Sequence, residues 1–201
     1  MVRRPALIAL LVLAATVSTA SADGLYFSEG LGGTRVHDEL SAFLPDAFHA
    51  RVAIGMRRRE WAYELFFAGH FSNDIYDYGA PQTNLVTGGL SVKYIQPIAP
   101  HLELYLRGTA SVGATDQDLQ GYSGRGLGAG AGIQLKGKGS VLGLLWWPLF
   151  FLKQGPRMTA ALWLDTGYEF YRLQPGDQKR GSAIDAQLST MTFGFALGTD
   201  F

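Results

Sequence analysis

The sequence alternates between large apolar residues and small or polar residues, and it does so in eight separate segments. The clearest example lies near the carboxyl end, where Met191, Phe193 and Phe195 alternate with Thr192 and Gly194. A period of two is the spacing of side chains on one face of a β-strand. Each segment is therefore predicted to be a strand with one apolar face and one small or polar face. The predicted strands cover residues 25–36, 50–57, 61–71, 86–94, 102–112, 127–136, 158–171 and 184–201.

The connections between these segments predict an up-and-down order of strands. Short turns are expected at 58–60 and 96–100. Longer polar stretches are found at the opposite ends of the same strands. The predicted long loops are 37–49, 72–84, 114–125 and 172–183. Short turns at one end and long loops at the other are typical of transmembrane barrels, whose long loops face outward from the cell.

An even number of amphipathic strands predicts closure, because an open sheet edge in lipid would leave backbone groups unpaired. The mean hydropathy of +0.07 is too low for a bundle of membrane helices and fits residues that alternate between lipid and lumen. We therefore predict an all-β fold, an eight-stranded antiparallel up-and-down transmembrane β-barrel in which 25–36 pairs with 184–201.

Two irregularities interrupt the pattern. Glu29 falls on the apolar face of the first strand, which predicts a bulge or local shift there. In the last strand the apolar positions change parity near Leu188, which predicts a change of facing at that point.

The amino-terminal segment has the pattern of a signal peptide. Two arginines at 3–4 precede an apolar run over 6–17, and small residues at 18–22 fit signal peptidase. The apolar run is too short to span a bilayer as a helix. We predict a signal peptide over 1–22 and a barrel over 23–201, with an uncleaved anchor as the alternative.

Charged residues on the small or polar faces are predicted to line the lumen. They are balanced in sign, and an eight-stranded barrel is only wide enough for side chains to fill it. A packed, salt-bridged lumen is therefore expected, with a gated small-ion pore as the alternative. Lys93 is expected opposite Glu103, and Arg57 close to Glu64 across their turn. The predicted lumen residues are Arg51, Arg57, Glu64, Lys93, Glu103, Arg107, Asp165 and Glu169.

Aromatic residues are predicted at the two membrane interfaces. Trp61, Tyr94 and Phe201 are expected near the short turns. An apolar insertion at 137–156, which contains Trp146 and Trp147, replaces the short turn expected between the sixth and seventh strands. Its run is interrupted by a proline and is too short to span as a helix. It is interpreted either as a hydrophobic hairpin tip or, preferably, as a short helix in the periplasmic membrane interface.

One short motif carries possible chemistry. His70, Ser72 and Asn73 form a His-x-Ser-Asn stretch that resembles the catalytic stretch of PagL-type lipid A 3-O-deacylases. The resemblance implies a general base, a nucleophile and an oxyanion-hole residue, in that order. The orienting carboxylate that the family carries on its next strand has no counterpart over 84–91, and our strand register turns His70 and Ser72 toward the lumen.

The whole chain resembles, by pattern, the small eight-stranded outer-membrane barrels such as the OmpA transmembrane domain, OmpX and OmpW. That resemblance implies a structural or surface-interaction protein without an enzymatic step. It further implies a monomer among outer-membrane lipid and lipopolysaccharide. Periplasmic chaperones and the barrel assembly machinery would recognise its C-terminal strand. A lipocalin-like soluble ligand carrier, with its apolar face inward, is the remaining alternative.

Composition narrows the other classes of function. The chain has 17 basic and 17 acidic residues, so its net charge is zero and no nucleic-acid partner is indicated. It has no cysteine, which removes disulfides and thiolate metal sites. The four histidines show no metal-ligand spacing, and no cofactor is predicted.

Overall fold

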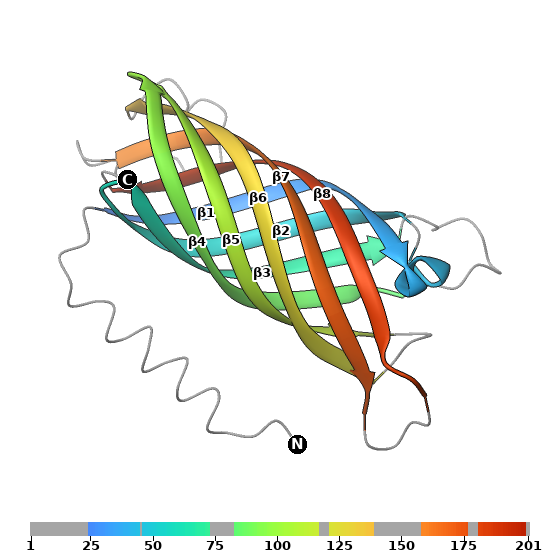
Figure 1. Cartoon of the computed structure of the whole chain (residues 1–201). Coiled ribbons are helices and arrows are strands. Elements are labelled where there is room, and N and C mark those ends of the chain that lie inside the picture. The colour runs from blue at the N-terminus through green and yellow to red at the C-terminus, as the bar shows by residue number, and fades with distance from the viewer. Residues whose placement is uncertain are drawn as a thin grey trace, which may run out of the picture.

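The computed structural model is a closed, tilted β-barrel built from eight antiparallel strands in sequence order (Figure 1). It describes residues 24–44, 46–72, 83–116, 121–138, 158–176 and 181–199. The predicted fold class is confirmed. The strands are β1 (Gly24–Asp38), β2 (Asp46–Arg58), β3 (Trp61–Ser72), β4 (Leu85–Ala99), β5 (Leu102–Thr115), β6 (Tyr122–Lys138), β7 (Met158–Pro175) and β8 (Ile184–Thr199), with a 3₁₀ helix η1 (Glu39–Ala42) between β1 and β2.

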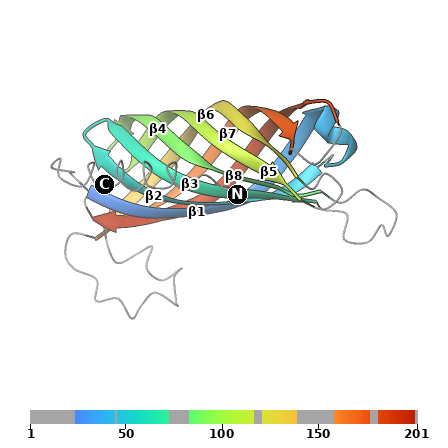
Figure 2. The same ribbon diagram turned by 90° about the horizontal axis from the view of Figure 1, so that it is seen from below.

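The first and last strands close the barrel. Their pairing runs without interruption from Tyr26 opposite Gly198 to Asp38 opposite Ala186 (Figure 2). Every strand in the barrel thus has two hydrogen-bonded neighbours, which is how a sheet satisfies its backbone groups in an apolar solvent. Among the described helices, none has the length and apolar character needed to cross a membrane.

The bulge expected at Glu29 does not occur. Glu29 lies opposite Val52 on one side and Phe195 on the other, and both pairings keep an unbroken register. Its side chain points outward between Phe27 and Leu31 and is only partly exposed. The ladder of backbone hydrogen bonds therefore holds the register even where one outward side chain is charged.

The change of facing expected near Leu188 is also wrong. Ile184, Ala186 and Leu188 are buried on the same side of β8 as Thr190 and Thr192. The strand keeps one facing throughout. What changes along it is the environment, because the lumen is polar in the middle of the barrel and apolar at the mouth beside η1.

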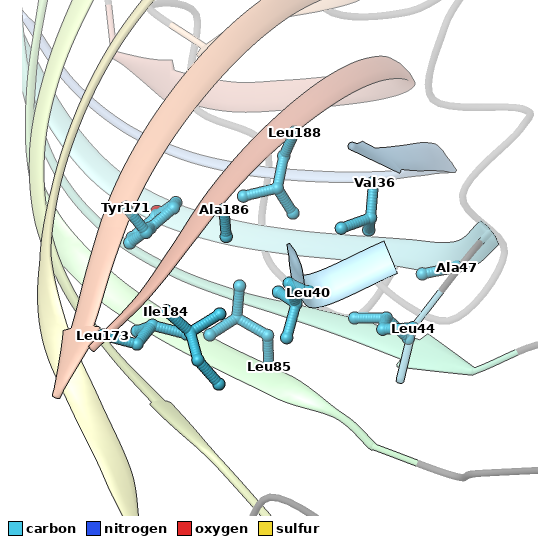
Figure 3. Packing of buried hydrophobic residues seen from close by; sticks show 10 residues of the cluster. All are labelled: Val36, Leu40, Leu44, Ala47, Leu85, Tyr171, Leu173, Ile184, Ala186 and Leu188. Carbon is cyan, nitrogen blue, oxygen red and sulfur yellow. The ribbon is translucent and has the colours of Figure 1, made fainter. Parts of the chain in front are cut away.

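An apolar cluster fills that mouth. Leu40 and Leu44, from η1 and the residues after it, are fully buried and point toward Leu85 and Leu188 of the barrel wall (Figure 3). The turn is held in part by the Ser41 hydroxyl, which donates to the Asp38 carbonyl at 2.6 Å. The cluster comprises Val36, Leu40, Leu44, Ala47, Leu85, Tyr171, Leu173, Ile184, Ala186 and Leu188.

The strands extend farther toward this mouth than the sequence predicts. β2 begins at Asp46, β6 begins at Tyr122 and β7 ends at Pro175. The loops expected at 37–49, 114–125 and 172–183 are correspondingly shorter, whereas most of the loop expected at 72–84 lies outside the described residues. On β6, β7 and β8 the outward side chains near this end are polar, so the apolar alternation stops there before the strand does.

Glycines on the inward faces make room for four interior aromatic rings. A Cβ atom on Gly126 would overlap the ring of Tyr171, and one on Gly132 would overlap that of Tyr105. In the same way Gly55 faces Tyr26, while Gly30 and Gly194 both face Trp163. The glycines at every second position of β6 therefore reflect close packing inside a narrow barrel.

We predict that Gly126→Ala destabilises the barrel by about 1–3 kcal/mol, because the added methyl group overpacks a fully buried ring. Gly108→Ala is the matched control, since a Cβ atom there would meet no other atom within 4 Å. Urea titrations of the refolded protein, followed by the loss of the folded gel band, measure both effects. Equal midpoints for the two variants would contradict this account of the interior.

Candidate functional site

The centre of the barrel holds a buried carboxylate with four hydrogen-bond donors. Glu64 is 2% exposed, and it accepts hydrogen bonds from Lys93 at 2.5 Å and Arg51 at 3.0 Å. The Tyr26 and Ser91 hydroxyls donate to the same carboxylate at 2.9 and 3.0 Å. The five residues come from β1 to β4, so Glu64 ties together half of the barrel wall.

A second network surrounds Glu103. The guanidinium of Arg57 donates to both carboxylate oxygens, at 2.8 and 3.0 Å, in a bidentate pair. Lys136 lies 3.0 Å from one oxygen, and Gln134 donates to the other. This network connects β2, β5 and β6 near the end of the barrel that carries the short turns.

A third network joins β5 to β7. Arg107 donates to Asp165 at 2.6 and 3.2 Å and lies 3.5 Å from Glu169. Glu169 also accepts a hydrogen bond from the Tyr171 hydroxyl at 2.7 Å, which in turn accepts one from Ser111 at 2.9 Å. This third network lies next to the apolar cluster of the mouth, which shares Tyr171.

All eight charged residues that the alternation assigned to the lumen lie inside the barrel and form ion pairs there. The expected partners differ, however. Lys93 lies opposite Arg107 in the sheet and pairs with Glu64, while Arg57 lies opposite Ala62 and pairs with Glu103. Arg57 on β2 reaches across the lumen to Glu103 on β5. Lys93 instead turns to the neighbouring strand β3, where Glu64 lies two residues beyond Ala62, the residue directly opposite Lys93. Neither pairing follows the nearest turn, which is why spacing along the sequence does not reveal it.

Sequence reasoning missed two kinds of contributor. Lys136 pairs with Glu103 but is not among the lumen residues that the sequence predicts, although its place on the polar face of the strand 127–136 is a signal for it. The aromatic partners were missed as well. The Lys93 ammonium lies 4.8 Å from the ring centre of Tyr105 and 5.9 Å from that of Trp163, and the Arg51 guanidinium lies 4.4 Å from Phe66. Cation–π contacts of this kind supplement the ion pairs of a desolvated charge.

His70 is enclosed in the lumen. It is 0% exposed, and its Nδ1 lies 2.9 Å from the Thr34 hydroxyl and 3.3 Å from Nδ1 of His49. Ser72 follows on the same face of β3, and its backbone N–H donates to the Asn84 side chain at 3.3 Å. An imidazole buried in this way has no open path to an ester outside the barrel wall. Asn73, the third residue of the motif, lies outside the described residues.

The described residues contain no group of three or more histidine and carboxylate side chains that could hold a metal ion. Outside the barrel, Trp61 and Tyr94 are partly exposed side by side, with ring centres 5.1 Å apart. Trp146, Trp147 and Phe201 lie outside the described residues, as do the predicted signal peptide 1–22 and most of the insertion 137–156.

We predict that Glu64→Gln lowers the free energy of unfolding by about 3–5 kcal/mol, because it leaves buried cations without their counter-ion. The matched control is Asp46→Asn, whose exposed pair with Arg35 has a 3.6 Å separation and is expected to contribute less than about 1 kcal/mol. Denaturant titration of both variants in detergent or lipid gives the two values. A Glu64→Gln loss no larger than that of the control would contradict the assigned role of the network.

The comparisons with known proteins agree with this architecture. No protein-family model matches the sequence, and no curated protein matches it either. Among solved structures, neisserial surface protein A superposes with a TM-score of 0.56 at 14% identity, covering 90% of this chain and 98% of that one. OprG from Pseudomonas aeruginosa gives 0.46 at 9% identity, covering 88% and 96%. Ail of Yersinia pestis gives 0.47 at 15% identity, covering 87% and 97%. The chain therefore has the fold of the small eight-stranded outer-membrane β-barrels.

Proposed function

We propose that this protein is a monomeric barrel of the outer membrane with a structural or surface-interaction role and without a catalytic step. The observation that carries the proposal is the reversed distribution of side chains. Leu106 and Leu127 are 64% and 69% exposed on the outside, whereas Glu64 and Arg107 are buried within. A barrel with this distribution is stable when lipid surrounds it.

The same distribution opposes the lipocalin-like alternative. A soluble carrier would turn its apolar face inward around a ligand, and here that face points outward. The inward face instead holds three ion-pair networks and, at one mouth, the apolar cluster around Leu40. We infer a plugged lumen rather than a conducting one, since charges engaged with buried partners do not line an open path.

Location and partners follow from the sequence and the fold together. A cleaved signal peptide would deliver the chain to the periplasm, where chaperones and the barrel assembly machinery would receive it through its C-terminal strand. Lipopolysaccharide and phospholipid would then surround the apolar belt. The mouth that carries η1 would face the outside of the cell, where surface interaction takes place.

The membrane location is tested by Leu106→Arg. In a bilayer this change is expected to destabilise the barrel by about 2–4 kcal/mol near the middle of the belt, whereas at an exposed position of a soluble protein it stays within about 0.5 kcal/mol. Heat-modifiable gel mobility and recovery in the outer-membrane fraction provide the readouts. His101→Arg, in the exposed turn between β4 and β5, is the control and is expected to be neutral. Equal stability of the two variants would contradict the proposal.

The absence of catalysis is tested by Ser72→Ala. We expect this variant to leave the acylation of lipid A unchanged when the protein is expressed in a Gram-negative host, because the adjacent His70 is sealed inside the barrel. Mass spectrometry of extracted lipid A, beside a strain without the protein, provides the measurement. Loss of an acyl chain that depends on Ser72 would support the deacylase alternative instead.

A further inference from the structure

A row of outward residues crosses five strands near the mouth that carries η1. The pairing places Phe67 opposite Gly88, Gly88 opposite Val112, Val112 opposite Arg125, and Arg125 opposite Arg172. The row thus begins in the apolar belt of the barrel and ends on two adjacent arginines. None of the three interior networks includes these residues.

A groove follows this row on the outer surface. It has a volume of about 850 Å³, and its lining includes Val86, Gly88 and Ala114 as well as Arg125 and Arg172. A second groove of about 670 Å³ is almost entirely apolar and shares Phe67, Gly88, Val112 and Arg125 with the first. The two grooves together form a continuous furrow that is apolar along its length and basic at one end.

Gly88 lies in the wall of both grooves, where the absence of a side chain leaves space. A Cβ atom at that position would meet only ordinary contacts, 3.5 Å from the Phe66 carbonyl and 3.8 Å from the Phe67 ring. A larger side chain at 88 could therefore project into the furrow without disturbing the wall. This position offers a way to fill the groove selectively.

Arg125 and Arg172 lie directly opposite each other on β6 and β7. Residues directly opposite in a sheet have Cβ atoms about 4.5–5.5 Å apart, and like charges at that spacing repel each other. Within the described part of the chain Arg125 forms no ion pair. The nearest ion pair of Arg172 is a weak one with Asp185, at 4.0 Å, and the Arg172 and Asp185 side chains are both exposed. An anion between the guanidinium groups would relieve this repulsion and accept hydrogen bonds from the N–H groups of both arginines.

We propose that Arg125 and Arg172 bind the phosphate of a phosphorylated membrane lipid whose acyl chain lies in the furrow over Gly88. Charge complementarity selects the headgroup, and the apolar furrow selects a lipid over a free anion. The inference rests on the proposed membrane location and adds to it a specific lipid site on the barrel wall. The site lies at the level where the outward face of β6 and β7 changes from apolar to polar residues.

The test uses the refolded full-length protein in detergent micelles, titrated with diphosphorylated lipid A and observed by native mass spectrometry. Arg125→Gln and Gly88→Leu are each expected to weaken the apparent affinity at least ten-fold. Arg35→Gln is the matched control. It removes one positive charge from the outward face at the same end of the barrel, but on β1 and outside both grooves, and we expect it to change the apparent affinity less than two-fold.

Three results would overturn the proposal. They are equal binding of dephosphorylated lipid A, equal weakening by Arg35→Gln, or inorganic phosphate binding as tightly as the lipid. Each variant is first checked for wild-type heat-modifiable mobility, so that misfolding is not read as lost binding. A wild-type protein that fails to insert into lipid vesicles refutes the membrane proposal itself, whereas one that inserts and shows no phosphate preference refutes only this site.

Discussion

Closure between β1 and β8 is the constraint on which the rest of the structure depends. In lipid an unpaired strand edge would expose a row of backbone donors and acceptors with no solvent to satisfy them. The uninterrupted pairing from Tyr26 to Asp38 removes both edges at once. It also holds the register at Glu29, whose outward charge does not shift the ladder.

Closing only eight strands makes the lumen narrow, and the narrow lumen determines the interior. Aromatic rings fit because glycines face them, as Gly126 faces Tyr171. Charges are accommodated because each has an oppositely charged partner inside the barrel, as Arg57 has in Glu103. A buried charge without a partner is strongly destabilising, so the networks specify one packing of the interior more than they add net stability.

The polarity of the outer surface changes along the barrel axis. The belt around Leu106 is apolar, whereas Arg125 and Arg172 mark its upper boundary on β6 and β7. At the same level the lumen changes in the opposite sense, from the ion pairs to the apolar cluster around Leu40. The inside and the outside therefore exchange polarity at the mouth.

The sequence by itself determined the strand number, the closed fold and the facing of the eight lumen charges, because a period of two assigns each residue to a face. The tertiary structure decided which charges pair, since Lys93 pairs with Glu64 on the neighbouring strand β3 rather than with Glu103 across its turn. It also decided the facing of Leu188, which the pattern misassigned. Alternation records that two faces differ, but it does not say what each face meets. That depends on the surroundings of the outer wall at each level and on the segment after β1 that folds into the mouth.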